Sequence, residues 1–173
     1  MSVAVITKNE EGYLRACLES VRDHVEEIVV LDSFSTDRTR EIALEFSARF
    51  HQEAFKGFAS QRNRGAELAS HDWVLQLDAD ERVEPGVWTV LRTLFDCGGP
   101  SHPAYALPRK STSEDGKFHL WVRYYPVFLF RFYDRRKCRW VREYLEYLTW
   151  EGSRGFIPHH LCHERPVDTP EAL

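Results

Sequence analysis

Short runs of aliphatic and β-branched residues alternate with helix-forming segments through the first half of this chain. Strands are predicted at 3–6, 28–31 and 73–77, with a weaker one at 48–51, because each run is too short and too β-branched for a helix. Helices are predicted between and after them, at 11–24, from the N-cap candidates of 33–37 to about 46, at 59–69 and at 85–95. This alternation predicts right-handed crossovers and a parallel sheet covered by helices on both faces.

Polar clusters follow three of these predicted strands. They occupy residues 7–11 after the first strand, 32–37 after the second and 78–81 after the fourth. The carboxyl ends of parallel strands lie at one edge of a sheet, and α/β proteins bind their ligands at that edge. The pattern therefore predicts a binding site built from these three segments.

Beyond Cys97 the pattern changes to aromatic-rich strands. A Gly-Gly-Pro break at 98–100 precedes strand patterns at 105–107, 127–133 and 144–150, a polar loop at 111–117, a turn at 152–155 and a polar tail at 164–173. The fold class expected is α/β, a mostly parallel sheet flanked by helices, with an antiparallel, aromatic-rich C-terminal part.

Composition excludes several classes of protein. With 43% hydrophobic and 29% charged residues, the 173-residue chain is typical of one globular domain with its own core. The cysteines form no C-x-x-C pair, which favours reduced thiols in a cytosol. No apolar run approaches the ~20 residues of a membrane span, and the pattern of a secretory signal is absent. Extracellular, integral-membrane and disulfide-stapled classes are excluded, and a cytoplasmic location is expected.

Asp78 and Asp80 are candidate metal ligands. Because they stand two residues apart at a strand end, their carboxylates are expected to project to the same side. A divalent cation is the usual means of relieving the repulsion between two such groups, and Mg²⁺ or Mn²⁺ then takes its remaining ligands from water and phosphate oxygens. The ordinary alternative is a solvated turn.

Five further residues each have a functional and an ordinary structural explanation. Asp32 can accept an N–H from the edge of a base or cap the following turn, and Arg62 can donate to a base carbonyl or lie solvated on a helix. His163, in the segment HHLCH at 159–163, can complete a metal site or be a hydrogen-bonded surface histidine. Glu143 and Glu146 lie among aromatics, where a carboxylate can act as a general base or pair with the nearby Arg139 or Arg142.

Glycine-rich phosphate loops are absent from the sequence. Neither G-x-G-x-x-G nor G-x-x-x-x-G-K-[ST] occurs, and there is no G-x-S-x-G nucleophile elbow. A nucleotide bound here would rely on a metal ion, rather than on a glycine cradle, to hold its phosphates.

Four ordered segments resemble the motifs of family 2 glycosyltransferases. They are VAVITKNEE at 3–11, IVVLDSFSTDRT at 28–39, QRN at 61–63 and WVLQLDADER at 73–82, spread across about half of the chain. Within that family they resemble most the bacterial lipopolysaccharide-core glucosyltransferase type. The segments YALPR at 105–109 and Tyr125-Pro126, with Arg131 and His163, extend the resemblance more loosely.

The resemblance implies a GT-A fold and the transfer of a sugar from a nucleotide donor, UDP-sugars being favoured, to an acceptor hydroxyl with inversion. The residues that it places at the nucleotide of the donor are Thr7, Asn9, Glu11, Asp32, Arg62 and Asp78. Asp80 and Asp78 would meet the metal-bound diphosphate, and His163 matches a late histidine that serves the metal. The metal expected is Mg²⁺ or Mn²⁺.

One departure from the family pattern concerns the catalytic base. Relatives of this type carry a His-Glu pair after the basic strand, where this chain has Leu145-Glu146. Glu146 is therefore expected to accept the proton of the acceptor hydroxyl, with Glu143 as the second candidate. The imperfect match keeps open a non-catalytic nucleotide-sugar-binding module as an alternative.

Basic and aromatic residues are concentrated at 117–142 in a chain whose net charge is −4. The resemblance implies that this stretch is a surface for a glycan or glycolipid acceptor, or for peripheral contact with the inner face of the cell membrane. The ordinary alternative is a strand with an aromatic core face and a solvated basic face. The basic residues named for phosphate contact are Arg131, Arg135, Arg136, Lys137 and Arg139. Nucleic-acid binding is disfavoured by the negative net charge.

The length predicts a single domain, 1–173. Within it we expect a nucleotide-sugar-binding half at 1–97 and an acceptor-side half at 98–173. Members of the family usually continue past the position of His163, whereas this chain stops about ten residues after it. The expectation is either a minimal version of the fold or one lacking a C-terminal segment that would close the acceptor site.

Overall fold

Six consecutive buried residues, Ser2–Thr7, form the central strand β1. In the computed structural model, which describes residues 1–111, 127–143 and 145–164, β1 pairs in parallel with β2 (Glu27–Asp32) and with β4 (Trp73–Asp78). β3 (Arg49–Gln52) continues the parallel part beyond β2. The registers place Thr7 beside Asp32 and Ile6 beside Asp78, so the three polar clusters meet at one edge of the sheet.

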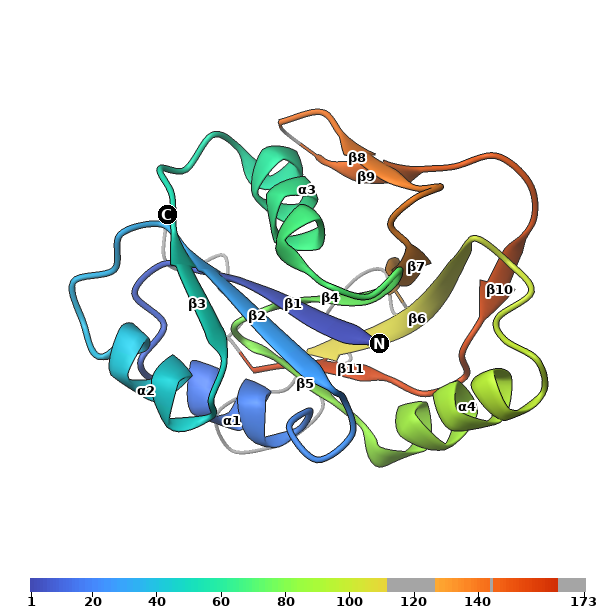
Figure 1. Ribbon diagram of the computed structural model, residues 1–173, viewed down its shortest axis with the longest axis horizontal. Helices are drawn as coiled ribbons and strands as arrows, with labels where there is room; N and C mark the ends of the chain where they lie inside the picture. The colour runs from blue at the N-terminus through green and yellow to red at the C-terminus, as the bar shows by residue number, and fades with distance from the viewer. Residues whose placement is uncertain (112–126, 144, 165–173) are drawn as a thin grey trace, which may run out of the picture.

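Helices cover both faces of this sheet (Figure 1). In the described ranges they are α1 (Leu14–Glu19), α2 (Thr39–Glu45), α3 (Phe58–Leu68) and α4 (Pro85–Asp96). α1, α2 and α4 lie on one face and α3 on the other. Alternate residues of β1 pack on opposite faces of the sheet. Val3 and Val5 belong to the larger core cluster, and Ala4 belongs to the cluster that includes residues of α3. No helix in these ranges is long and apolar enough to cross a bilayer.

The second half of the chain completes the sheet in mixed orientation. β7 (Val127–Asp134) runs antiparallel to both β4 and β6 (Ala104–Ser111). β11 (Leu161–His163) lies between β6 and β5 (Glu81–Val83), and β10 (Arg154–Phe156) pairs with β6 off the main path. Among the described residues the sheet has nine strands, with the main order β3-β2-β1-β4-β7-β6-β11-β5.

A separate two-stranded sheet, formed by β8 (Arg139–Val141) and β9 (Tyr147–Thr149), lies beside α3 (Figure 1). Asn63 of α3 fixes its position, because the amide donates to the carbonyl oxygen of Trp140 at 2.8 Å and accepts from the Trp140 backbone N–H at 2.9 Å. The indole N–H of Trp140 also donates to the buried hydroxyl of Tyr133 at 3.1 Å. The hairpin is therefore anchored to both α3 and the main sheet.

The α/β class and the main strands and helices of the first half are confirmed, but α1 is shorter than the predicted 11–24. The helix ends where Ser20 turns to other partners, since its hydroxyl accepts from Val83 N–H and its carbonyl accepts from the Trp88 indole. The three-residue strands β5, β8, β10 and β11 were not predicted, and β10 begins inside the predicted turn at 152–155.

Several predictions for the second half are only partly tested. The strand predicted at 144–150 is confirmed for Tyr147–Thr149, whereas residue 144 lies outside the described residues. Other predicted segments also lie outside the described residues. They are 112–117 of the polar loop, Tyr125 and Pro126, 117–126 of the basic stretch and 165–173 of the tail.

Candidate active site

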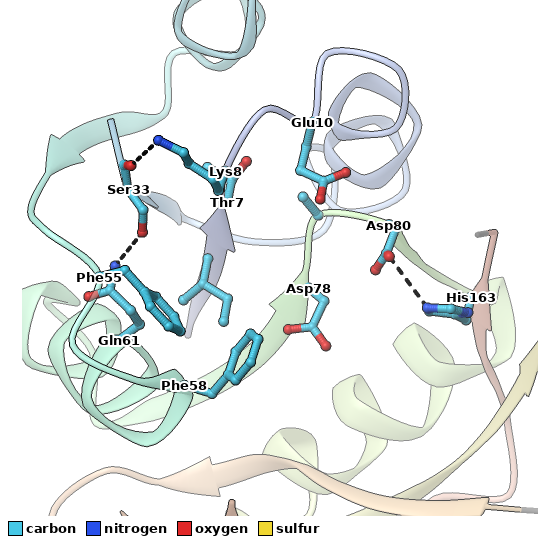
Figure 2. A pocket seen from close by; sticks show the side chains of 12 residues that line it. Thr7, Lys8, Glu10, Ser33, Phe55, Phe58, Gln61, Asp78, Asp80 and His163 are labelled. Carbon is cyan, nitrogen blue, oxygen red and sulfur yellow. Dashed lines mark hydrogen bonds and ion pairs between the residues drawn. The ribbon is translucent and has the colours of Figure 1, made fainter. Parts of the chain in front are cut away.

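A cleft of about 600 Å³ opens at the carboxyl ends of β1, β2 and β4, where the three polar clusters meet. Its lining residues are Ile6, Thr7, Lys8, Glu10, Ser33, Phe55, Phe58, Gln61, Asp78, Ala79, Asp80 and His163. Figure 2 shows Phe55 and Phe58 across the cleft from Asp80 and His163. The cleft therefore has an aromatic side and an acidic side.

The loop after β1 is braced by Asn9 and Glu11 and turns Glu10 into the cleft. Asn9 adopts a left-handed φ of 54°; its amide oxygen accepts from Thr36 N–H at 2.9 Å, and its own N–H donates to Ser35 at 2.7 Å. Glu11 is similarly bonded, accepting from Arg38 N–H at 3.0 Å. Of the residues predicted here, Thr7 lines the cleft, whereas Asn9 and Glu11 hold the loop, and Glu10 takes the lining position.

Asp32 lies inside the protein at the end of β2, with no exposed surface. One carboxylate oxygen accepts from Ser35 N–H at 2.8 Å and from the Gln52 amide at 2.9 Å, and the other accepts from the Ser35 hydroxyl. These bonds shape the turn that presents Ser33 to the cleft. The capping explanation of Asp32 is therefore seen in the structure, and Ser33 is the residue from this turn that lines the cleft.

Asp78 is held between two buried guanidinium groups. Arg62 of α3 lies 2.8 Å from one carboxylate oxygen and Arg131 of β7 lies 2.6 Å from the other. Arg131 also contacts the fully buried Glu81 at 3.1 Å, and Arg62 contacts Glu146 at 3.2 Å. We call these five residues the ion network. It contains the pair Asp78 and Arg62 that the sequence proposed for the donor, but Arg62 is 3% exposed rather than solvated.

The ion network changes the pKa values of its acids in opposite directions. Burial would raise the pKa of Asp78, but the guanidinium groups of Arg131 and Arg62 outweigh it and hold this pKa well below its ordinary value. Burial raises the pKa of Glu81 above its ordinary value, and Arg131 only partly opposes this. Asp78 is therefore held ionised, and the ionised form of Glu81 is stabilised by Arg131.

Asp80 and His163 face each other on the acidic side, with 3.3 Å between the imidazole Nε2 and a carboxylate oxygen (Figure 2). A carboxylate with an imidazole suits a divalent cation whose other ligands are water and phosphate. Asp78 fits this role less well, because both of its oxygens are engaged by arginine. In the described ranges, no group of three or more His, Cys, Asp and Glu side chains forms a metal-binding cluster. Asp80 and His163 can therefore supply two protein ligands to a metal ion.

The two candidate bases, Glu146 and Glu143, lie on the segment between β8 and β9. Glu146 pairs with Arg62 rather than with the nearby Arg139 or Arg142 considered from the sequence. Glu143 is exposed and packs against Gly57, where an added Cβ would lie 3.2 Å from its side chain. Neither glutamate lines the cleft, but Glu146 pairs with Arg62, which in turn pairs with Asp78 of the cleft.

Sequence reasoning missed the aromatic side of the cleft and the position of Arg131. Phe55 and Phe58 are about half exposed, at 53% and 49%, and their rings meet edge to face at 5.1 Å. Two phenylalanines beside the QRN segment were an available signal. Arg131, expected either at a phosphate-contacting acceptor surface or on a solvated basic face, is 3% exposed because it neutralises Asp78 and Glu81. Its acidic partners are far away in the sequence, so no local pattern marks it.

Comparison with known proteins identifies relatives of this chain. The model for "Glycosyl transferase family 2" matches residues 2–148. A TPR repeat-containing protein of Synechococcus elongatus is 39% identical over 113 residues, which are 65% of this chain and 28% of that protein. The lipopolysaccharide core biosynthesis glycosyltransferase LpsC of Rhizobium meliloti is 35% identical over 100 residues, covering 55% of this chain and 37% of LpsC. The chain thus spans about a third of the length of these relatives.

One solved structure with the same fold is glucosyl-3-phosphoglycerate synthase from Mycobacterium tuberculosis. It is 25% identical with a TM-score of 0.51, and the match covers 66% of this chain and 44% of that one. The synthase was crystallised with Mn²⁺, uridine diphosphate and glucosyl-3-phosphoglycerate. The mostly parallel sheet expected from the sequence therefore has the GT-A architecture of a nucleotide-dependent enzyme.

Proposed function

Because the chain belongs to glycosyl transferase family 2, we propose that it transfers a sugar from a nucleotide-sugar to an acceptor hydroxyl with inversion at the anomeric carbon. The observation that carries this proposal is the cleft, which joins an aromatic side, Phe55 and Phe58, to an acidic side, Asp80 and His163. A base can stack on rings, and a diphosphate needs a cation near carboxylates. UDP-sugars are the favoured donors, since the related synthase was crystallised with UDP.

In this proposal the nucleotide lies across the ends of β1, β2 and β4. Thr7, Glu10 and Ser33 would contact it directly, because they line the cleft. The Thr7 hydroxyl is buried and has no hydrogen-bond partner among the described residues, which suits a bond to a ligand. Asn9, Glu11 and Asp32 would act by holding the two loops in shape, through the bonds described above.

Mg²⁺ or Mn²⁺, held by Asp80 and His163, would neutralise the charge that develops on the departing nucleoside diphosphate. Asp78 would contribute a fixed negative charge in the cleft wall, balanced by Arg62 and Arg131. The protein would then act mainly by positioning the two substrates. The cleft would hold the donor while the acceptor oxygen approaches the opposite face of the sugar.

Proton transfer completes the proposed reaction. The acceptor oxygen forms a bond to the anomeric carbon, the bond from that carbon to the diphosphate breaks, and the hydroxyl proton passes to a carboxylate. We assign this role to Glu146 first, because it pairs with Arg62, the partner of Asp78 in the cleft, and to Glu143 second. Since Glu146 is paired with Arg62, ligand binding would have to loosen this pair before the carboxylate accepts a proton.

A glycan or glycolipid of the cell envelope, such as lipopolysaccharide, is the proposed acceptor, on the basis of the likeness to LpsC. The chain would act in the cytoplasm, with peripheral contact to the inner face of the membrane where such acceptors are presented. As one domain, it would use residues 1–97 for the donor and 98–173 for the acceptor.

The proposal is tested by a thermal-shift panel of UDP-, GDP- and dTDP-sugars with and without Mn²⁺, followed by an assay of nucleotide release. A ligand at 100 times its Kd stabilises the folded state by about 2.7 kcal/mol, so the correct base should stand out. Asp80→Asn should abolish transfer and leave the circular dichroism spectrum unchanged, whereas Asp23→Asn, a change at a surface side chain that is 75% exposed, should retain it.

Two outcomes would count against the proposal. Full activity of Asp80→Asn in the presence of metal would remove Asp80 from the mechanism. Nucleotide-sugar binding without any release of nucleotide, in the presence of a broad panel of acceptors, would favour a binding module of the same fold.

A further inference from the structure

A second cavity, of about 310 Å³, lies between β7 and the β8–β9 hairpin. Its lining residues are Arg62, Phe128, Leu129, Phe130, Arg131, Trp140, Glu146, Tyr147, Leu148 and Trp150. Most of these side chains are aromatic or aliphatic, and the exceptions are the two arginines and Glu146. The volume is at the lower end of the roughly 300–1,000 Å³ of small-molecule sites.

The aromatic and the charged residues of this cavity differ in exposure. Phe128 and Tyr147 are 50% and 47% exposed, whereas the side chains of Arg62 and Arg131 are each only 4% exposed. Aromatic rings therefore remain open to solvent at the surface, while the charged groups lie deep. Concave sites of this kind, apolar with a few converging polar groups, are typical of small polar ligands.

Arg131 has donors to spare in this cavity. Its Nη2 contacts both Asp78 and Glu81, but its Nε and Nη1 are buried and have no hydrogen-bond partner among the residues that the structure describes. The guanidinium groups of Arg131 and Arg62 lie 6.0 Å and 5.0 Å from the centre of the Trp140 ring. Arg131 therefore has two buried N–H donors that an oxygen atom of a ligand could accept from.

The second cavity and the cleft share one wall, the ion network. Asp78 lines the cleft, while its partners Arg62 and Arg131 line the second cavity. Glu146, the first candidate for the base, lines only the second cavity. A hydroxyl bound near Glu146 would therefore approach the cleft from the side opposite to its nucleotide-binding loops.

We propose that the second cavity binds a neutral sugar ring of the acceptor. The apolar face of the ring would stack on the aromatic side chains, and its hydroxyl oxygens would accept from Arg131 while one hydroxyl donates to Glu146. This inference rests on the proposed function and adds the place and chemistry of the acceptor to it.

A neutral ring fits better than a phosphate because the charges at this wall already balance. Arg62, Arg131 and the nearby Arg109, which lies 3.7 Å from Glu81, face Asp78, Glu81 and Glu146. These six described groups leave no net positive charge to attract an anion, although individual N–H groups of Arg131 remain to hydrogen-bond an oxygen. The phosphate-binding role suggested from the sequence for Arg131 is therefore replaced by hydrogen bonding to a hydroxyl.

The test uses the methyl glycosides of glucose, galactose and mannose at millimolar concentration, with saturation-transfer NMR as the readout. At least one glycoside should receive saturation from the protein. Phe128→Ala and Tyr147→Ala should each weaken this binding roughly threefold to tenfold, the loss expected for one stacking contact. Phe95→Ala is the matched control, because Phe95 is a partly exposed phenylalanine of α4 that does not line this cavity.

Nucleotide binding, measured separately with UDP and Mn²⁺, distinguishes failure of this inference from failure of the proposed function. The two cavity variants should bind UDP like the unchanged protein, since neither residue lines the cleft. If no glycoside binds, or if binding is equally strong in the two variants, the inference is overturned even where UDP binds well. If glycosides bind as expected but no nucleotide does, the cavity is supported and the donor proposal is wrong.

Discussion

Arg131→Met tests whether the ion network supports the fold as the distances indicate. Arg131 is the cation shared by Asp78 and Glu81, at 2.6 Å and 3.1 Å. Breaking a buried ion pair by removing one partner typically costs about 3–5 kcal/mol, because the other charge stays buried without compensation. Methionine keeps most of the apolar volume, so the loss should come from charge rather than from a cavity.

The structure places the expected loss near the lower end of that range. Asp78 is 26% exposed at its side chain and keeps Arg62, so it remains partly compensated. Glu81 has no exposed side-chain surface, and among the described residues it keeps Arg109, at 3.7 Å, and the backbone N–H of Asp78, at 3.1 Å. We therefore expect a loss of about 3 kcal/mol in the free energy of unfolding at neutral pH. With a typical urea m-value of about 2 kcal/mol/M, the midpoint should fall by about 1.5 M.

The pH dependence of this variant follows from Glu81. Burial raises the pKa of Glu81 while Arg131 lowers it, so losing Arg131 should raise the pKa further in the folded protein. A carboxyl with a higher pKa in the folded than in the unfolded state binds more protons when folded, so its destabilising effect grows as the pH rises through the interval between the two values. Lowering the pH toward 5 should therefore recover part of the stability of Arg131→Met.

Urea unfolding, followed by tryptophan fluorescence at pH 7 and pH 5, measures both effects. Arg22→Met is the matched control: its partner is Asp23, the two side chains are 55% and 75% exposed, and surface pairs contribute about 0–1 kcal/mol. The double variant Arg131→Met with Glu81→Gln should be more stable than Arg131→Met alone, since it removes the uncompensated charge. Equal losses for Arg131→Met and Arg22→Met would refute the reasoning.

Two further predictions concern residues outside the site. Burial would raise the pKa of Glu27, but hydrogen bonds from Ser2, Ser70 and Arg49 lower it to about 2. The stability that this ionised carboxylate provides, up to about 3 kcal/mol, should be lost as the pH falls from about 4.5 to 2. Thermal unfolding of Glu27→Gln should therefore lack this loss of stability at low pH. Gly57→Ala should cost about 1–3 kcal/mol because φ is +100° there. Gly12→Ala, with open space around it, should change stability by less than about 0.5 kcal/mol, and a similar loss in both would contradict the argument.

Much of the parallel half could be predicted because its signals are local. A run such as 28–31 is β-branched and too short for a helix, so it indicates a strand without reference to the rest of the chain. The short strands β5 and β11 could not be predicted in this way. Each has three residues, and their pairing with each other joins segments about 80 residues apart. Such short strands depend on their neighbours in the sheet rather than on their own pattern.

The candidate site shows the same limit at the level of single residues. From the loop after β1 the sequence named Thr7, Asn9 and Glu11 for the donor, whereas Thr7 and Glu10 line the cleft. The left-handed φ of Asn9 and its bonds to Ser35 and Thr36 decide which way each side chain points. Those bonds join residues 26 and 27 positions apart, so the direction of Glu10 is a property of two loops together.

The sequence by itself determined the alternation of strands and helices, the three polar clusters at strand ends and the resemblance to family 2 glycosyltransferases. Each depends on residues that are neighbours in the chain, where periodicity and motif spacing act. Only the tertiary structure decided that Arg131 is buried and that Glu146 pairs with Arg62, since these contacts span 53 and 84 residues. A buried charge must find its partner wherever the fold places one, and that requirement places Arg131 of β7 against Asp78 of the cleft.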